Sequence, residues 1–83
     1  MPTRLHYFAR AVRNAAGVMQ GGEPHRFLTA QDAEDGGALL ARLEGAAVAY
    51  QQIGDAENDI WDEPELLGVY GELNEAAVIA AVA

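Results

Sequence analysis

The chain has 83 residues, a formal net charge of −8, and no cysteine, lysine or serine. These absences exclude a disulfide framework, a thiol nucleophile, a Schiff-base or P-loop lysine and a serine triad. The length predicts a single domain over residues 1–83, and no apolar run approaches the roughly 20 residues that span a bilayer. We therefore expect a soluble, cytoplasmic protein that needs no cofactor and does not enter a membrane.

Charge is distributed unevenly along the chain. Residues 1–42 contain all five arginines and four acidic residues, whereas residues 43–83 contain nine acidic residues and no basic one. The formal charges of the two halves are therefore +1 and −9. Such asymmetry concerns partners and association rates. Because nucleic-acid phosphates demand cationic partners, it argues against direct nucleic-acid binding by this chain.

Two strands are predicted before residue 30. In "RLHYFARAVR" (4–13), polar side chains recur at even positions, which assigns the core side to Leu5, Tyr7, Ala9 and Ala11. Phe8 and Val12 break this alternation, so the second face is expected to be partly covered as well. After the turn residues "NAAG" (14–17), a second strand is predicted over residues 18–29. Its glycine pair at 21–22 and Pro24 predict a bulge or an edge position.

Residues 29–45 predict the main helix. Thr29 is a good N-cap, acidic residues occupy the first turns, and Gly45 suits the C-terminal end. Gly36 and Gly37 are unfavourable inside a helix. They indicate either a close approach of the helix to the sheet or a helix that starts later, near residue 37. A third strand is expected over residues 46–53, ended by Gly54.

The last third of the chain is harder to assign. Pro64 at an N1-like position, followed by Leu66, Leu67 and Tyr70, predicts one or two helical turns within residues 63–71. Residues 74–83 are expected to form a short helix capped by Asn74, a strand, or a flexible tail. The expected fold class is α+β: a small antiparallel sheet of about three strands, one main helix packed on it, and a short C-terminal helix.

The segment "DAENDIWDEPE" (55–65) holds six carboxylates and the only tryptophan, with no basic residue. Asp55, Glu57 and Asp59 match the first positions of an EF-hand loop, but Ile60 and Leu66 replace the required glycine and glutamate. We therefore expect no dedicated metal site, with weak cation binding as an alternative. The two histidines lie at no diagnostic spacing, so they are expected to be exposed or hydrogen-bonded strand residues. No catalytic residue is predicted.

The same segment is the predicted partner-binding site. An aromatic side chain surrounded by charge is typical of an interaction hot spot, and closely spaced carboxylates resemble a row of phosphates. The expected partner is a protein with a basic nucleic-acid-binding groove. The alternatives are a solvated acidic face and a tryptophan that packs into the core. The predicted partner-binding residues are Asp55, Glu57, Asp59, Trp61, Asp62, Glu63 and Glu65.

The small size, the acidity, the lack of catalytic residues and the run "GDAENDIWDEPELLGVYGEL" resemble small phage-encoded inhibitors, anti-CRISPR proteins in particular. The resemblance implies a non-enzymatic DNA mimic, acting in the host-cell cytoplasm, that blocks nucleic-acid binding by a CRISPR effector such as a surveillance complex. A pure mimic would not need five arginines. They are expected to form a counter-face, to pair with the acidic half, or to join two copies.

A second functional interpretation concerns self-association. The apolar tail is expected either to pack into the core or to form a homodimer seam, with candidate contacts at Val78, Ile79 and Val82. The alternative function is therefore that of an accessory or structural small protein, a phage or operon component that acts through homo-oligomer or other protein contacts.

Overall fold

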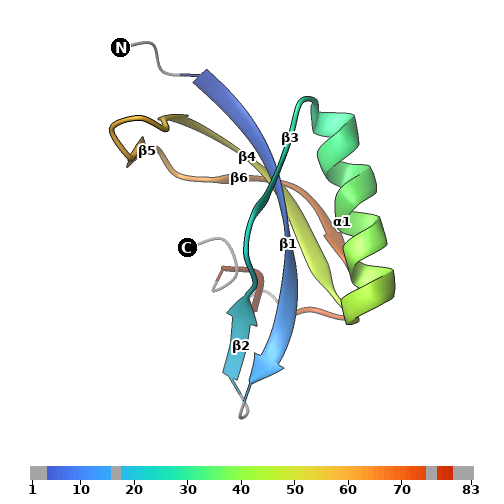
Figure 1. Ribbon diagram of the computed structural model, residues 1–83. Coiled ribbons are helices and arrows are strands. Elements are labelled where there is room, and N and C mark those ends of the chain that lie inside the picture. Colours follow the sequence, from blue (N-terminus) through green and yellow to red (C-terminus); the bar gives the residue numbers. More distant parts are fainter. Residues whose placement is uncertain (1–3, 16–17, 75–76, 80–83) are drawn as a thin grey trace.

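The computed structural model describes residues 4–15, 18–74 and 77–79 (Figure 1). Two long antiparallel strands, β1 (Arg4–Ala15) and β4 (Ala47–Asp55), form the middle of a six-stranded sheet. β1 is flanked by β2 (Val18–Gly21) and β3 (His25–Phe27), and β4 by β5 (Ile60–Trp61) and β6 (Glu65–Tyr70). The predicted α+β class is confirmed, with six antiparallel strands in place of about three.

The predicted second strand is divided into two. β2 pairs with the end of β1 and β3 with its middle, both on the same edge of that strand. Residues 22–24 lie between them, and the Gly22 N–H donates to the Ala11 carbonyl oxygen at 2.7 Å. This is the interruption that the glycine pair and Pro24 predicted. Of the predicted turn at 14–17, Asn14 and Ala15 belong to β1, and residues 16–17 lie outside the described residues.

Helix α1 (Ala30–Glu44) has the predicted ends. The Thr29 hydroxyl accepts a hydrogen bond from the Asp32 N–H at 3.1 Å, and Gly45 closes the helix with φ 102°. The two internal glycines let the helix approach the sheet closely. A Cβ on Gly36 would overlap the Phe27 ring, and one on Gly37 would lie 2.8 Å from the Tyr70 ring. Close approach, rather than a later helix start, therefore explains this glycine pair.

One predicted boundary and one predicted element are wrong. Gly54 does not end the third strand, because β4 continues to Asp55, and the helical turns predicted within 63–71 are replaced by strand β6. The pairing of β6 with β4 changes register between Ala49 and Tyr50, which leaves Leu67 as an extra residue between Leu66 and Gly68. Such a bulge shifts the side-chain alternation by one residue. The apolar residues of β6 therefore do not alternate as in a regular strand, and their spacing is that of a helix.

The sheet is covered unequally on its two faces. Helix α1 packs on one face, where Ala9, Ala47 and Ala49 are fully buried (Figure 1). On the other face lies a cluster of buried residues, Val12, Ala46, Val48 and Tyr50, with Phe8, Leu73 and Val78 packed against it. Burial of Val12 confirms the partial cover predicted for this face. The predicted core side of β1 is correct for Ala9 and Ala11, whereas Leu5 is 43% exposed.

A short helical segment at residues 77–79 supplies part of the second cover. The Asn74 side-chain oxygen accepts a hydrogen bond from the Ala77 N–H at 2.8 Å, so Asn74 is the cap that the sequence predicted. Among the described residues, no helix is long and apolar enough to cross a membrane.

Candidate functional site

Residues 55–65, here called the acidic hairpin, comprise the end of β4, a tight turn, β5 and the residues that lead into β6. Asp55 is buried and organises the turn. Its Oδ1 accepts from the backbone N–H groups of Glu57 and Asn58 at 3.1 and 3.4 Å, and its Oδ2 accepts from the Asn58 amide at 2.6 Å. The side-chain hydrogen bond from Asn58 is the main cause that lowers the pKa of Asp55. Asp55 is therefore a structural residue of the turn.

Trp61 is held against the sheet by two neighbours. Its indole N–H donates to Asp59 Oδ1 at 2.8 Å, and its ring makes edge contacts with His6 and Phe8, with centroid distances of 5.1 and 5.8 Å. Gly54 stands directly opposite Trp61, and a Cβ on Gly54 would overlap the indole. The tryptophan packs on the surface of the sheet and is half-buried, so it lies outside the buried cluster and not within the core, where one interpretation expected it.

The other predicted acidic residues are exposed, but they do not lie on one face, as a surface that imitates a row of phosphates was expected to require. Glu57 and Asp59 border clefts on the face opposite α1. Glu65 accepts a hydrogen bond from Gln51. Gln51 lies between Tyr50 and Gln52 of the opposite face, so its side chain and that of Glu65 lie on the helix-covered face. Asp62 and Glu63 follow β5 and are exposed. Carboxylates therefore surround the hairpin on both sides, with Ile60 63% exposed at its end.

The ion pairs of the described residues leave the acidic hairpin uncompensated. Arg13 pairs with Glu44 at 2.8 Å, far from the hairpin in the fold. Within the described ranges, no salt bridge joins Arg4, Arg13, Arg26 or Arg42 to residues 55–65. Arg13 thus pairs with the acidic half of the chain, one of the three roles left open, whereas the strand positions of Arg4, Arg10 and Arg26 favour a counter-face.

The sheet surface opposite α1 is here called the open face, and it carries His6, Phe8, Tyr50 and Trp61. The sequence did not predict this group of residues. Phe8 stacks on Tyr50 at 5.3 Å, and the Arg10 guanidinium lies 5.9 Å from the Tyr50 ring centre. Arg4, His6, Phe8 and Arg10 alternate along β1, and Arg26 is paired opposite Phe8, so three arginines project from this one face. In the sequence, polar residues at even positions of 4–10 indicated one shared face of β1. Arg26 and Trp61 become part of this face only through strand pairing.

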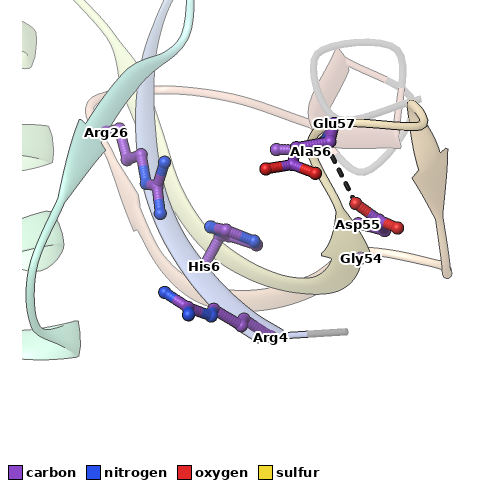
Figure 2. A pocket seen from close by; sticks show the side chains of 7 residues that line it. All are labelled: Arg4, His6, Arg26, Gly54, Asp55, Ala56 and Glu57. Atoms are coloured by element: carbon purple, nitrogen blue, oxygen red, sulfur yellow. Dashed lines mark hydrogen bonds between the residues drawn. The ribbon is translucent and has the colours of Figure 1, made fainter. Parts of the chain in front are cut away.

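A cleft of about 240 Å³, here called the arginine cleft, lies where the open face meets the acidic hairpin. Figure 2 shows Arg4, His6 and Arg26 on one side of it, with Asp55 and Glu57 on the other. His6 was expected to be exposed or hydrogen-bonded. It is instead only 4% exposed, and its Nδ1 has no hydrogen-bond partner in the described structure.

The predicted dimer contacts are divided between core and surface. Val78 packs against the buried cluster of the open face, Ile79 is 59% exposed, and Val82 lies outside the described residues.

In the part of the chain that the structure describes, no three histidine or acidic side chains come close enough to hold a metal ion. The sequence matches no protein-family model, no curated protein and no solved structure.

Proposed function

We propose that this chain is a non-enzymatic binding protein that inserts its acidic hairpin into a basic groove of another protein. The observation that carries the proposal is the exposure of five carboxylates around one hydrogen-bonded hairpin; within the described residues, none of them forms a salt bridge with Arg4, Arg13, Arg26 or Arg42. These carboxylates belong to Glu57, Asp59, Asp62, Glu63 and Glu65. A hairpin that enters a groove end-first is contacted on both sides, so carboxylates on both sides suit this mode better than a flat row would.

The rigidity of the hairpin supports the same proposal. Asp55 fixes the turn, and the backbone N–H of Asp62 donates to the Ile53 carbonyl oxygen at 2.9 Å. The Gln52 amide donates to the Asp62 carbonyl oxygen at 2.8 Å. Preorganised charges lose little conformational entropy on binding, and uncompensated charges increase the association rate. Exposed Ile60 adds apolar contact at the end of the hairpin.

The target most consistent with this chemistry is a protein whose groove is lined by Arg and Lys and normally holds nucleic acid. The specific form of the proposal is inhibition of a CRISPR effector in the cytoplasm of a host cell, by competition with DNA for its basic channel. Competition of this kind depends strongly on salt, because both partners are highly charged.

The test is a displacement experiment with a CRISPR surveillance complex and its target DNA at low and high salt. The native chain is compared with a triple variant, Glu57→Gln, Asp62→Asn and Glu63→Gln. Its matched control, Glu23→Gln, Glu34→Gln and Glu72→Gln, removes the same charge away from the hairpin. Salt-sensitive displacement that the control keeps and the hairpin variant loses supports the proposal. Equal displacement by both variants assigns the effect to net charge and overturns the role of the hairpin.

A further inference from the structure

We propose that the open face binds a mononucleotide-sized ligand, with its phosphate in the arginine cleft and its planar ring in the adjoining cleft lined by Phe8 and Trp61. This proposal is independent of the function proposed for the acidic hairpin. The phosphate position rests on residues outside the acidic hairpin, namely Arg4, His6 and Arg26, whereas Trp61 of the hairpin contributes to the ring position. Phosphate binding does not require the hairpin to enter a groove, so either proposal can fail without the other.

The phosphate position follows from two guanidinium groups. Arg4 and Arg26 are both exposed, both line the arginine cleft, and neither forms an ion pair with another described residue (Figure 2). Arginine presents a planar set of donors that matches phosphate oxygens, and such charge-assisted hydrogen bonds are stronger than neutral ones. Arg4 and Arg26, which form no ion pair within the described residues, therefore lie where an anion can be held.

His6 provides a second, separate observation. Its ring forms part of the lining of the cleft between the arginines and the acidic hairpin, and it is almost completely buried by Trp61 and Phe8. A buried polar atom without a partner is costly, and native folds seldom retain one without a reason. The unpartnered Nδ1 of His6 is explained if a bound ligand, with a small adjustment of the cleft, completes its hydrogen bonding.

The ring position follows from the neighbouring surface. A cleft of about 360 Å³ adjoins the first across His6 and Trp61, and its lining includes Phe8, Trp61, Pro24 and Gln52. Aromatic side chains beside cationic ones are the usual platform for stacking a nucleobase. Gln52 adds an amide at the rim, although its Nε2 already donates to the Asp62 carbonyl oxygen. The lining therefore suits a planar ring with polar edges.

The acidic hairpin limits the size of the ligand. Glu57 borders the phosphate position and Asp59 borders the ring position, so additional phosphates along a chain would meet carboxylates of like charge. The formal net charge of −8 disfavours a polyanion further. This distribution of charge allows one phosphate to bind, whereas it disfavours a strand of nucleic acid.

The test follows the indole N–H signal of the only tryptophan by NMR during titration with adenosine 5′-monophosphate. Adenosine, inorganic phosphate and a short single-stranded DNA are titrated in parallel. We expect saturable shifts with the nucleotide, and binding about tenfold or more weaker for adenosine and for phosphate alone, because each lacks one half of the contacts. Absence of shifts at millimolar nucleotide overturns the proposal, and tighter binding of the DNA overturns its size limit.

Matched arginine variants locate the site. Arg26→Gln should weaken nucleotide binding about tenfold or more, whereas Arg42→Gln, the same charge change on exposed helix surface, should leave it unchanged. Because both side chains are exposed, both variants are expected to fold, which circular dichroism checks. Equal weakening by the two variants, or none by Arg26→Gln, would refute the assignment of the phosphate to the arginine cleft.

Discussion

The two faces of the sheet are built from different residues and differ in what they leave available. The helix-covered face uses Ala9, Ala47 and Ala49 against Gly36 and Gly37, so the helix backbone lies close to the strands. The open face uses larger residues, Phe8, Tyr50 and Trp61, among arginines. Along β1 and β4 the small residues produce a close interface, and the cleft on this side lies at β3, beside Phe27 and Leu40. On the open face, large aromatic residues border clefts directly.

The helix-covered face therefore contributes mainly to stability, and the open face leaves side chains available for binding. Alanine and glycine contribute little apolar area each, but they permit dense packing, and dense interiors respond sharply to added volume. On the open face, burial is concentrated at one end, where Leu73 and Val78 cover Val48 and Val12. At the other end, Arg4, His6 and Phe8 line two clefts, although His6 itself is buried.

The largest expected effect is from overfilling the helix-covered face. Ala49→Leu adds three carbon atoms where a Cβ on Gly37 would already lie 3.4 Å from the Ala49 methyl group. We expect a loss of about 3 kcal/mol in the free energy of unfolding, measured by urea denaturation. Ala56→Leu, at an exposed position of the hairpin turn, is the control and should change stability little. A stable Ala49→Leu variant would show that the interface is loose.

The next effect is from emptying the covered end of the open face. Val48 is completely buried, so Val48→Ala removes two methyl groups from the cluster and leaves a cavity. A loss of about 2 kcal/mol is expected from the same denaturation measurement. Val69→Ala removes the same groups from a side chain that is 40% exposed, and it should cost clearly less. Equal losses from the two variants would contradict the two-sided core.

A smaller effect on stability, with a clear spectroscopic signature, is expected from Gly54→Ala. The new methyl group would overlap the indole and lie 2.7 Å from the Ile60 carbonyl oxygen, so Trp61 should leave His6 and Phe8. Lost aromatic contacts cost about 1 kcal/mol, and displacement of the Ile60 backbone adds to this loss. The emission of the freed indole should shift to longer wavelength. Ile53→Ala, next to Gly54 but on the helix-covered side, should leave the emission unchanged. An unshifted Gly54→Ala spectrum would contradict the packing of Trp61.

The smallest effect compares one tyrosine from each face. Burial is the main cause that raises the pKa of both Tyr50 and Tyr70; Arg10 partly opposes it at Tyr50, whereas Glu34 and Asp35 reinforce it at Tyr70. A raised phenol pKa means that the folded state keeps its proton to higher pH than the unfolded chain does. The stability that this provides is therefore full below the ordinary tyrosine pKa of 10.0 and is lost as the pH rises through the folded-state values.

Salt should separate the two tyrosines, because it screens the charged neighbours and leaves burial unaffected. High salt is expected to lower the pKa of Tyr70, which loses the effect of two carboxylates, and to raise that of Tyr50, which loses the effect of a guanidinium. NMR titration of the tyrosine ring carbons measures both. Shifts in the same direction would show that the charge environments of the two faces are alike.

Local sequence signals predicted the parts of the molecule that depend on neighbours in the chain. Thr29 and Gly45 predicted the ends of α1, Asn74 predicted the cap of the last helical segment, and Pro24 with its preceding glycines predicted the break between β2 and β3. Each is a short-range interaction between a side chain and the adjacent backbone, so the sequence alone contains it.

Strand β6 and the open face depended on contacts between distant residues. Because of the bulge at Leu67, the apolar residues of β6 have helical spacing in the sequence. The position of the extra residue is determined by pairing with the free edge of β4. The sequence predicts an ordinary strand histidine at His6, since its burial comes from Trp61, which reaches it only through the pairing of β5 with Gly54.

By itself, the sequence determined the α+β class, the main helix, the acidity of residues 55–65 and the absence of thiol, lysine and serine chemistry. Composition and local hydrogen bonding fix these properties without reference to the fold. Only the tertiary structure decided that Asp55 builds the turn, that the carboxylates lie on both sides of the hairpin, and that Arg4, His6 and Arg26 border one cleft. Strand register brings those groups together, and register is set by packing across the whole sheet.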